Sequence, residues 1–183
     1  FGMRIIIDAR IIGTSTGNYA INLVNYLQKL DTKNEYVVIL SKGGAGKWKP
    51  SKPNFKAITT PYKNYSFGEQ LGFAWQLYSL KPDLVHFCMP QQPLLYFGKR
   101  VTTVHDITLV RFENIDMNPI IYKIRKRIFI FLLKNVIRRS QAIFTPTDYV
   151  RGDVLDFAGR KYSDKIIKTL EAGDPLADKA EPV

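Results

Sequence analysis

Short apolar runs alternate with amphipathic segments along almost the whole chain. The runs are apolar on both faces, as in parallel strands that helices cover on each side; they predict strands at residues 3–8, 36–40, 55–59, 84–88, 101–104, 141–145 and 165–170. Apolar residues at helical spacing predict helices at residues 18–30, 68–80, 119–139 and 148–158. This alternation predicts an α/β fold, a Rossmann-like three-layer α/β/α domain with a mostly parallel sheet.

The two ends of the chain depart from this pattern. Phe1 and Gly2 precede Met3 and look like the remnant of a cleaved tag. From Gly173 the sequence is polar and contains two prolines, as a linker does. We therefore expect one domain over residues 3–173, with residues 174–183 beginning an interdomain linker.

The charge of the chain favours anionic partners. Of its 183 residues, 27 are Lys or Arg and 16 are Asp or Glu, which gives a net charge of +11. Such an excess suits nucleic acid, phosphorylated substrates or an acidic membrane surface, without choosing among them. The single cysteine, Cys88, excludes a disulfide framework and fits a reducing compartment. The longest apolar run, residues 128–133, is far shorter than the ~20 residues of a membrane span.

The segment Val101-Thr-Thr-Val-His-Asp106 is the most informative stretch for function. Its β-branched residues suit a buried strand, whereas His105 and Asp106 do not, so we expect the strand to stop there. In a parallel α/β sheet the carboxyl ends of the strands face the crevice where ligands bind. His105 is therefore a candidate for contact with a polar substrate. The alternative is a histidine that only caps the strand and bonds to a loop.

The turn after the first strand is a second candidate site. Gly13 and Gly17 flank three small hydroxyl residues, Thr14, Ser15 and Thr16, just before a predicted helix. Unpaired N–H groups and the helix dipole at such a position attract phosphate. The spacing is not the Gly-x-Gly-x-x-Gly fingerprint of dinucleotide-binding proteins, which disfavours a nicotinamide or flavin enzyme. The alternative is a flexible surface turn.

Two further features have less specific explanations. The segment Gly43-Gly-Ala-Gly-Lys47 lacks the spacing of a phosphate-binding P-loop, and Trp48 stands where a Ser or Thr is needed, so we interpret it as a mobile basic loop. His86 lies inside an apolar strand and is more simply explained as a hydrogen-bonded core residue than as a ligand. No Cys or carboxylate cluster accompanies His86 and His105, so no metal site is expected.

The predicted helix at 119–139 is strongly basic and contains no acid. Ile121, Ile124, Ile128, Phe131 and Leu132 are expected to share one broad apolar face, with most cations opposite. Ile130 and Ile137 fall among the cations, where a solvated helix rarely places them. Such a face suits anionic lipid headgroups; the candidate contacts are Lys123, Lys126, Arg127, Lys134 and Arg138. The alternative is a core-packed helix with a solvated basic face.

Taken in order, several segments make the chain resemble the N-terminal half of the family 4 (group 1) glycosyltransferases. The matching segments are Met3–Arg10, Thr16–Tyr19, Asn34–Val37, Pro82–Phe87, Thr103–Ile107, Ser140–Thr147 and the closing Ile166–Pro175. They cover nearly the whole chain. No single motif is decisive, but their order and spacing together are fairly specific.

The resemblance implies the GT-B fold, in which two Rossmann-like domains face each other across a cleft. The N-terminal domain would handle the acceptor, and a C-terminal domain would bind the nucleotide-sugar donor. Transfer would retain the anomeric configuration and need no obligatory metal or other cofactor. The turn from Gly13 to Gly17 would face the donor phosphates and the acceptor, and His105 would be the catalytic residue that reaches the transferred sugar. Asp106 and Thr147 would support it.

The chain also departs from the family. Thr14 and Ser15 stand where the family often has paired glycines, so close approach of phosphate is less assured. The glutamate motif and the basic donor-binding residues of the family belong to the C-terminal half. We therefore expect that residues 1–183 alone do not transfer sugar and need that C-terminal domain as a partner.

The sequence thus predicts the acceptor-side domain of a retaining hexosyltransferase. Its acceptor would be a glycan, a polysaccharide or a lipid-linked sugar. The enzyme would act in the cytoplasm, as a peripheral protein on the inner face of the membrane. Its role would be in the synthesis of cell-envelope polysaccharide. A basic, non-enzymatic module that binds nucleic acid or another polyanion is the main alternative, although no recognition-helix or RNP signature supports specific nucleic-acid binding. A small nucleotide-binding regulator is a third candidate function.

Overall fold

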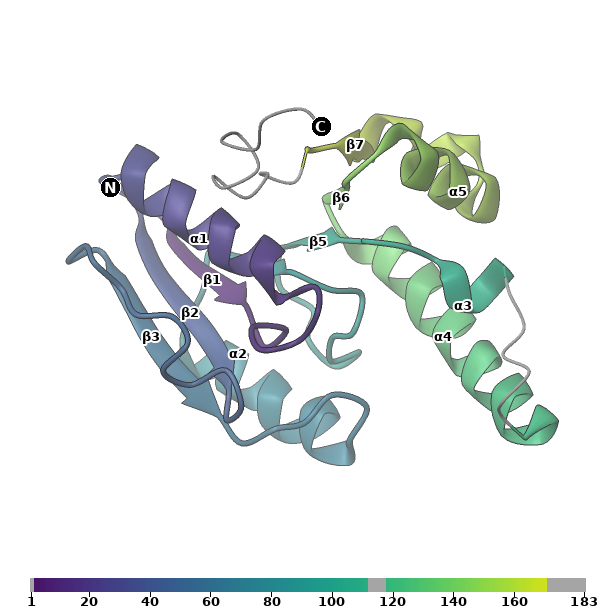
Figure 1. The fold of residues 1–183 in the computed structure, drawn as a ribbon, viewed down its shortest axis with the longest axis horizontal. Helices are drawn as coiled ribbons and strands as arrows, with labels where there is room; N and C mark the ends of the chain where they lie inside the picture. Colours follow the sequence, from purple (N-terminus) through teal and green to yellow (C-terminus); the bar gives the residue numbers. More distant parts are fainter. Residues whose placement is uncertain (1, 112–117, 171–183) are drawn as a thin grey trace, which may run out of the picture.

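The computed structural model describes residues 2–111 and 118–170, which contain one seven-stranded sheet. All strands pair in parallel, in the order β3-β2-β1-β4-β5-β6-β7 (Figure 1). They are β1 (Arg4–Asp8), β2 (Glu35–Ser41), β3 (Phe55–Thr60), β4 (Leu84–Phe87), β5 (Arg100–Thr103), β6 (Ala142–Thr145) and β7 (Ile166–Lys168). Each corresponds to a strand predicted from the sequence, and the Rossmann-like α/β/α fold is confirmed.

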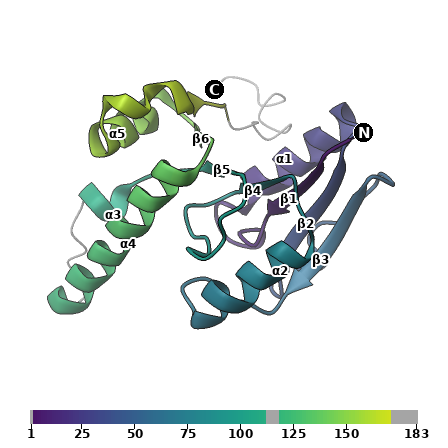
Figure 2. The same cartoon turned by 180° about the vertical axis from the view of Figure 1, so that it is seen from behind.

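Helices connect most of these strands and divide unequally between the two faces of the sheet. They are α1 (Gly17–Leu30), the π-helix η1 (Glu69–Phe73), α2 (Ala74–Ser79), α3 (Thr108–Arg111), α4 (Pro119–Arg139), α5 (Asp148–Ala158) and the 3-10 helix η2 (Arg160–Lys165). The chain crosses the sheet one way from β1 to β2 and the other way from β3 to β4, β5 to β6 and β6 to β7. Because such crossovers are right-handed, α1 lies on one face, whereas α2, α4 and α5 lie on the other. Figure 1 shows α1 in front of the strands, and Figure 2 shows α2 and α4 in front of them.

Three apolar clusters join the helices to the sheet. On the first face, Ala20 and Val24 of α1 pack with Ile7 and Val38. On the second face, Phe73 and Leu77 pack on β1, β2 and β4, and Leu133, Val136 and Ile137 of α4 pack with Ile143 and Ile166 of β6 and β7. Each such aliphatic or aromatic side chain stabilises the fold by about 1.5–3 kcal/mol when it leaves water. Apolar cores therefore cover both faces of the sheet.

Local sequence explains where most elements begin and end. Pro119 occupies the first turn of α4, and the Asn118 side chain accepts a hydrogen bond from Ile120 N, so this helix starts where the sequence predicted. Thr147 caps α5 as predicted, by accepting from Val150 N at 3.1 Å. Two details differ from prediction: the helix expected at 68–80 begins as a five-residue π-helix, and β5 ends at Thr103, two residues before His105.

Candidate functional site

The carboxyl ends of β1, β4 and β5 meet at one edge of the sheet, because these three strands are neighbours and run in parallel. Asp8 ends β1, and its carbonyl oxygen accepts a hydrogen bond of 3.2 Å from Cys88 N, just beyond β4. Burial raises the pKa of the Cys88 thiol well above its ordinary value, so this side chain stays protonated. The edge therefore has a backbone frame onto which neighbouring loops can attach.

His105 is anchored to this frame. Its Nε2 lies 2.9 Å from the carbonyl oxygen of Cys88. A carbonyl only accepts, so Nε2 carries a proton and donates it. Tyr19 lies edge-on to the imidazole, with ring centroids 4.8 Å apart at an angle of 81°. Two contacts thus fix the plane of the His105 ring, which is only partly buried.

Tyr19 joins the imidazole to the turn that the sequence singled out. It belongs to the first turn of α1 and stands two residues after Gly17. Its hydroxyl lies 2.8 Å from Oγ1 of Thr103, which also lies 2.9 Å from Nε2 of His86. The structure therefore brings His105 and the turn from Gly13 to Gly17 to the same edge of the sheet, linked by one aromatic side chain.

His86 is a satisfied core residue, as the simpler sequence interpretation predicted. It is buried, its ring packs against Phe144 with centroids 5.5 Å apart, and it bonds to Thr103. Burial, with a smaller contribution from the charge of His105, lowers the pKa of His86 from 6.5 to about 4. His86 is therefore neutral near pH 7.

The turn itself leaves the start of α1 open to an anion. No side chain caps α1, and its first turn contains no acid. Thr14 Oγ1 donates to Ile11 O at 2.8 Å, and Gly17 N donates to Thr14 O at 3.0 Å, which holds the turn closed. Gly13 has a φ of 101°, a conformation that favours glycine. A Cβ on Gly17 would lie 2.8 Å from Ile11 O, so this position also needs glycine.

The basic loop at 43–47 packs against this turn. A Cβ placed on Gly44 would lie 2.5 Å from Ile12 O, so the two backbones are in close contact. A Cβ on Gly13 would lie 3.2 Å from Nζ of Lys47, which places this ammonium group beside the turn. The sequence predicted a basic loop but gave no indication that it meets the turn at 13–17. The loop leads into β3 rather than into a helix, unlike a P-loop.

A buried charge network stands behind the turn, and sequence reasoning missed it. Arg10 donates from Nε and Nη2 to the two carboxylate oxygens of Asp8, both at 2.8 Å. The same Nη2 lies 2.8 Å from Oε1 of Glu69, and the guanidinium stacks on Phe73 at 3.9 Å. Burial disfavours the charge of Arg10, but the two carboxylates raise its pKa above its ordinary value. The network fixes the end of β1 to η1.

A signal for this network was available in the sequence. Asp8 is the last residue of a predicted buried strand and Arg10 stands two residues later, so two opposite charges lie beside an apolar run where pairing stabilises them. Glu69 is the first residue of η1, yet it is only 2% exposed. Its distance of 59 residues from Arg10 could not be bridged by any local pattern.

The two predicted supporting residues act as helix caps in the structure. Asp106 Oδ1 accepts from Thr108 N at 2.9 Å at the start of α3. Thr147 caps α5 beyond the carboxyl end of β6, which is the neighbour of β5. Both residues therefore shape the loops of the same sheet edge.

The structure does not bury the broad apolar face that the core-packed alternative assumed for the long basic helix. Of the five residues of that face, only Leu132 is buried, whereas Ile121, Ile124, Ile128 and Phe131 are 49–60% exposed. Ile137, placed among the cations, is 1% exposed and packs on the sheet, and Ile130 is half-buried. The C-terminal half of α4 covers β6 and β7, and its N-terminal half extends past the sheet, as Figure 1 shows.

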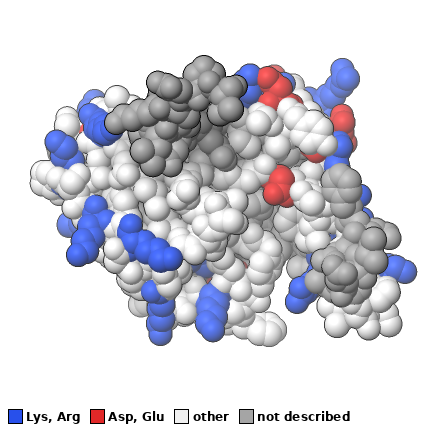
Figure 3. Space-filling model, in the orientation of Figure 1, with Lys and Arg blue, Asp and Glu red and all other residues white. Residues whose placement is uncertain are grey.

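The cations of α4 face solvent. Lys123, Arg127, Lys134 and Arg138 are exposed, and Lys126 is half-buried with its Nζ 5.7 Å from the ring centroid of Tyr122. Figure 3 shows basic side chains along the left and lower edges of the molecule and also on its right side, where α4 lies, with acidic ones mainly toward the upper right. Within residues 2–111 and 118–170, no helix is long and apolar enough to cross a membrane. In the same residues no three His, Cys, Asp or Glu side chains converge as metal ligands would.

Comparison with known proteins finds similarity in fold to two solved structures. No protein-family model matches the chain, and no curated protein sequence matches it. The structure of HepE from Anabaena in complex with UDP and glucose is similar, with a TM-score of 0.57, 15% identity, and coverage of 94% of this chain and 45% of HepE. An α-glucosyltransferase in complex with UDP and a 13-mer DNA containing an HMU base has a TM-score of 0.51 and 12% identity, and covers 95% of this chain and 44% of its own.

At these identities the likeness establishes the fold alone. The chain spans less than half the length of both proteins. The fold class expected from the sequence is thus shared with an enzyme that transfers glucose and with a protein that binds UDP and glucose. The expected tag remnant and domain limits remain predictions, because Phe1 and the segment 174–183 lie outside the described residues.

Proposed function

We propose that the chain is the acceptor-side domain of a retaining glycosyltransferase that uses a nucleotide-sugar donor. The observation that supports this most directly is the convergence of His105 and the turn at 13–17 on one sheet edge, through Tyr19. Two proteins of the same fold were solved with UDP. The acceptor in this proposal is a glycan, a polysaccharide or a lipid-linked sugar.

In this proposal each part of the edge has its own task. The open start of α1 and the ammonium group of Lys47 attract the anionic part of the donor. The His105 ring contacts the transferred sugar and shares charge with it in the transition state. Because Cys88 O and Tyr19 already hold the imidazole, little reorganisation is needed when the substrate binds. The reaction is proposed to need no obligatory metal, and Asp106 and Thr147 keep the surrounding loops in place.

The test uses the fact that the chain has only two histidines. In NMR spectra of the imidazole nitrogens of the full chain, UDP-glucose with a glycan acceptor should shift the His105 signals and leave those of buried His86 unchanged. An enzyme that contains this chain should lose about 100-fold or more in kcat on the change His105→Ala, with an unchanged melting temperature. Unchanged turnover would reject the catalytic role of His105.

The fragment itself is proposed to be inactive. Residues 1–183 mixed with nucleotide sugars and acceptors should release no UDP above background. Clear transfer by residues 1–183 alone would contradict this part of the proposal. We further propose that the enzyme acts in the cytoplasm, at the inner face of the membrane, where the exposed cations of α4 meet anionic headgroups.

A basic module that binds nucleic acid is the competing function, and the net charge of +11 favours it. Fluorescence anisotropy with generic DNA and RNA separates the two proposals. Tight binding that weakens steeply with salt, together with unmoved His105 signals in the presence of UDP-glucose, would favour the module over the enzyme.

A further inference from the structure

The exposed apolar side chains of this chain are concentrated on one side of the molecule. Of the eighteen large hydrophobic residues that the described structure exposes, eleven are Phe67 or belong to η1, to α2, to the loop at 92–98 or to α4. Leu71, Trp75, Phe97, Ile124, Ile128 and Phe131, which are 50–71% exposed, define what we call the outer apolar surface. Large apolar side chains that gather on one exposed face mark an interaction surface.

The two helices of this surface lie in one layer. Val85 of β4 pairs with Arg100 of β5, and Thr102 of β5 pairs with Ile143 of β6, so these residues point to the same face of the sheet. Leu77 of α2 packs with Val85, and Leu133 of α4 packs with Ile143. Both helices thus cover the same face, and Figure 2 looks onto that layer.

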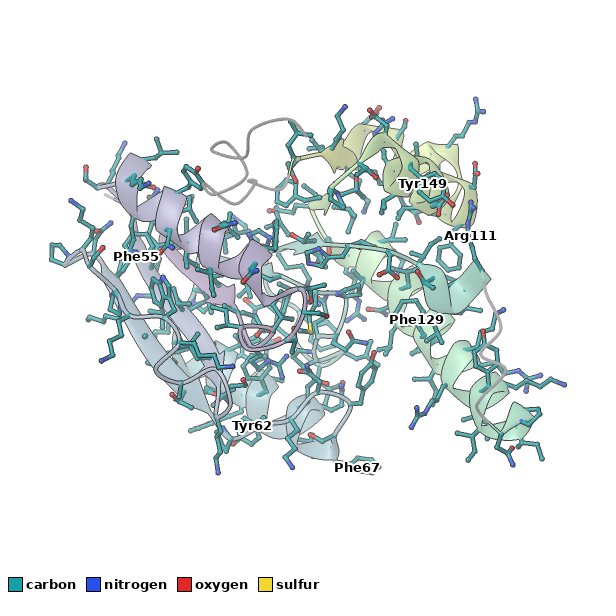
Figure 4. The ribbon with its side chains drawn as sticks, in the orientation of Figure 1. Phe55, Tyr62, Phe67, Arg111, Phe129 and Tyr149 are labelled. Atoms are coloured by element: carbon teal, nitrogen blue, oxygen red, sulfur yellow. The ribbon has the colours of Figure 1, made fainter. Side chains whose placement is uncertain are left out.

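The loop at 92–98 connects the two helices. The Tyr78 hydroxyl of α2 donates to Leu95 O at 3.2 Å and accepts from Phe97 N at 2.7 Å. Arg139, the last residue of α4, donates to Leu94 O at 2.9 Å and stacks on Phe97 at 4.5 Å. The loop at 92–98 therefore joins α2 to the C-terminal end of α4 on this face of the sheet. Figure 4 shows Phe67, just before η1, pointing away from the ribbon at the lower edge of the molecule.

The apolar stripe of α4 lies on the side opposite its buried residues. At 100° per residue, Ile124, Ile128 and Phe131 fall within about 60° of one another and opposite Leu133, which packs on the sheet. Lys123, Arg127, Lys134 and Arg138 form a row along one flank of this stripe by the same geometry. The sequence of α4 contains no Asp or Glu. An apolar stripe with a cationic border matches the boundary between acyl chains and anionic headgroups.

We infer that the outer apolar surface inserts into the headgroup region of an anionic lipid bilayer. This inference rests on the proposed function for its biological setting and changes one part of it, because apolar side chains of α2 and α4, and not the cations alone, hold the protein on the membrane. The charge pattern argues against a second copy as the occupant, since pairing two such faces would bring two rows of cations together. Trp75 and Tyr78 suit the interface, where amphipathic aromatic rings collect.

The two tryptophans of the chain make insertion directly measurable. Trp48 is buried and donates from Nε1 to Asn25 Oδ1 at 2.9 Å, whereas Trp75 is 71% exposed. Mixed phosphatidylcholine–phosphatidylglycerol vesicles should shift the emission of the chain to the blue, and brominated acyl chains should quench it. The variant Trp75→Phe should lose both effects while it still sediments with the vesicles.

Matched variants separate insertion from adsorption by charge. Ile124→Ser/Ile128→Ser should weaken vesicle binding by about tenfold or more, and Tyr26→Ser/Leu30→Ser, at exposed positions of α1 on the other face, should leave it unchanged. Lys123→Gln/Arg127→Gln should remove the preference for anionic over neutral vesicles. All these side chains are exposed, so each variant should fold, and circular dichroism checks that it does.

Three results would overturn the inference. If anionic vesicles quench the emission no more than neutral vesicles do, an anionic bilayer is not what the surface binds. Sedimentation without any quenching would mean that the cations alone hold the protein. A dimer in light scattering that Ile124→Ser/Ile128→Ser dissolves, without vesicle binding, would assign the surface to a second copy. None of these measurements involves sugar transfer, so an active enzyme that fails them would lose this inference and keep the proposed function.

Discussion

The carboxyl edge of the sheet and the outer face of α4 show opposite ways of placing side chains. At the edge, Arg10, His86 and His105 each have partners within 3 Å, and charges are buried only in a network. On the outer face of α4, isoleucines are about half exposed, with cations beside them. An edge whose arginine and histidines are held by partners suits a rigid site for a small molecule, whereas an uncovered apolar face suits a soft surface such as a bilayer.

The largest effect is expected from breaking the network at the edge. Arg10→Ala would leave Asp8 and Glu69 buried without a counter-charge, and should lower the free energy of unfolding by about 3–5 kcal/mol. Urea unfolding followed by circular dichroism measures this. Arg4→Ala is the matched control, because the Arg4–Glu35 ion pair is some 40% exposed and contributes about 0–1 kcal/mol. Equal losses in the two variants would show that the network does not stabilise the edge.

The second effect compares two residues of α4 that stand two positions apart in the sequence. Leu133→Ala should cost about 2–5 kcal/mol, because Leu133 is fully buried against the sheet. Phe131→Ala should change stability by no more than about 0.5 kcal/mol, because Phe131 is 60% exposed. Thermal unfolding of both variants is sufficient. A large loss from Phe131→Ala would mean that another part of the protein covers the outer face of α4.

These two residues also show what the sequence could and could not predict. Helical periodicity predicted α4 with its correct ends, and short apolar runs predicted all seven strands. Both signals are local in the sequence. Periodicity fixes which residues share a side of a helix, but the covering element decides which side is buried. On α4 both sides are apolar, and only the crossover onto β6 and β7 selects Leu133 over Phe131.

The candidate site divides in the same way. His105 and the turn at 13–17 were predictable, because the carboxyl ends of parallel strands always meet at one edge. The position of Lys47 beside Gly13 and the pairing of Arg10 with Glu69 depend on how loops far apart in sequence pack. No spacing rule reaches across such distances, so these parts of the site required the structure.

The third effect is a dependence of stability on pH. The pKa of His86 is about 4 in the folded chain and 6.5 when unfolded, so the unfolded state binds more protons between these values. The stability that neutral His86 provides is fully present above pH 6.5 and declines as pH falls toward 4, by about 3 kcal/mol in all. Urea unfolding at pH 7 and pH 4.5 measures the change. His86→Gln should flatten this part of the profile, and an NMR titration in which His86 protonates near pH 6.5 would contradict the explanation.

The smallest effect separates backbone strain from close contact at the turn. Gly13 has a φ of 101°, and a Cβ there would lie 3.2 Å from both Gly43 O and Lys47 Nζ. Gly46 has a φ of 85° with nothing within 4 Å, and Gly43 has neither constraint. Gly46→Ala should therefore cost about 1–2 kcal/mol through strain alone, and Gly43→Ala about zero. Gly13→Ala should cost more than Gly46→Ala, because Gly43 O is backbone and cannot turn aside as the lysine can. If Gly13→Ala and Gly46→Ala cost the same, the loop at 43–47 does not press on the turn, and the ammonium group of Lys47 has no fixed place beside it.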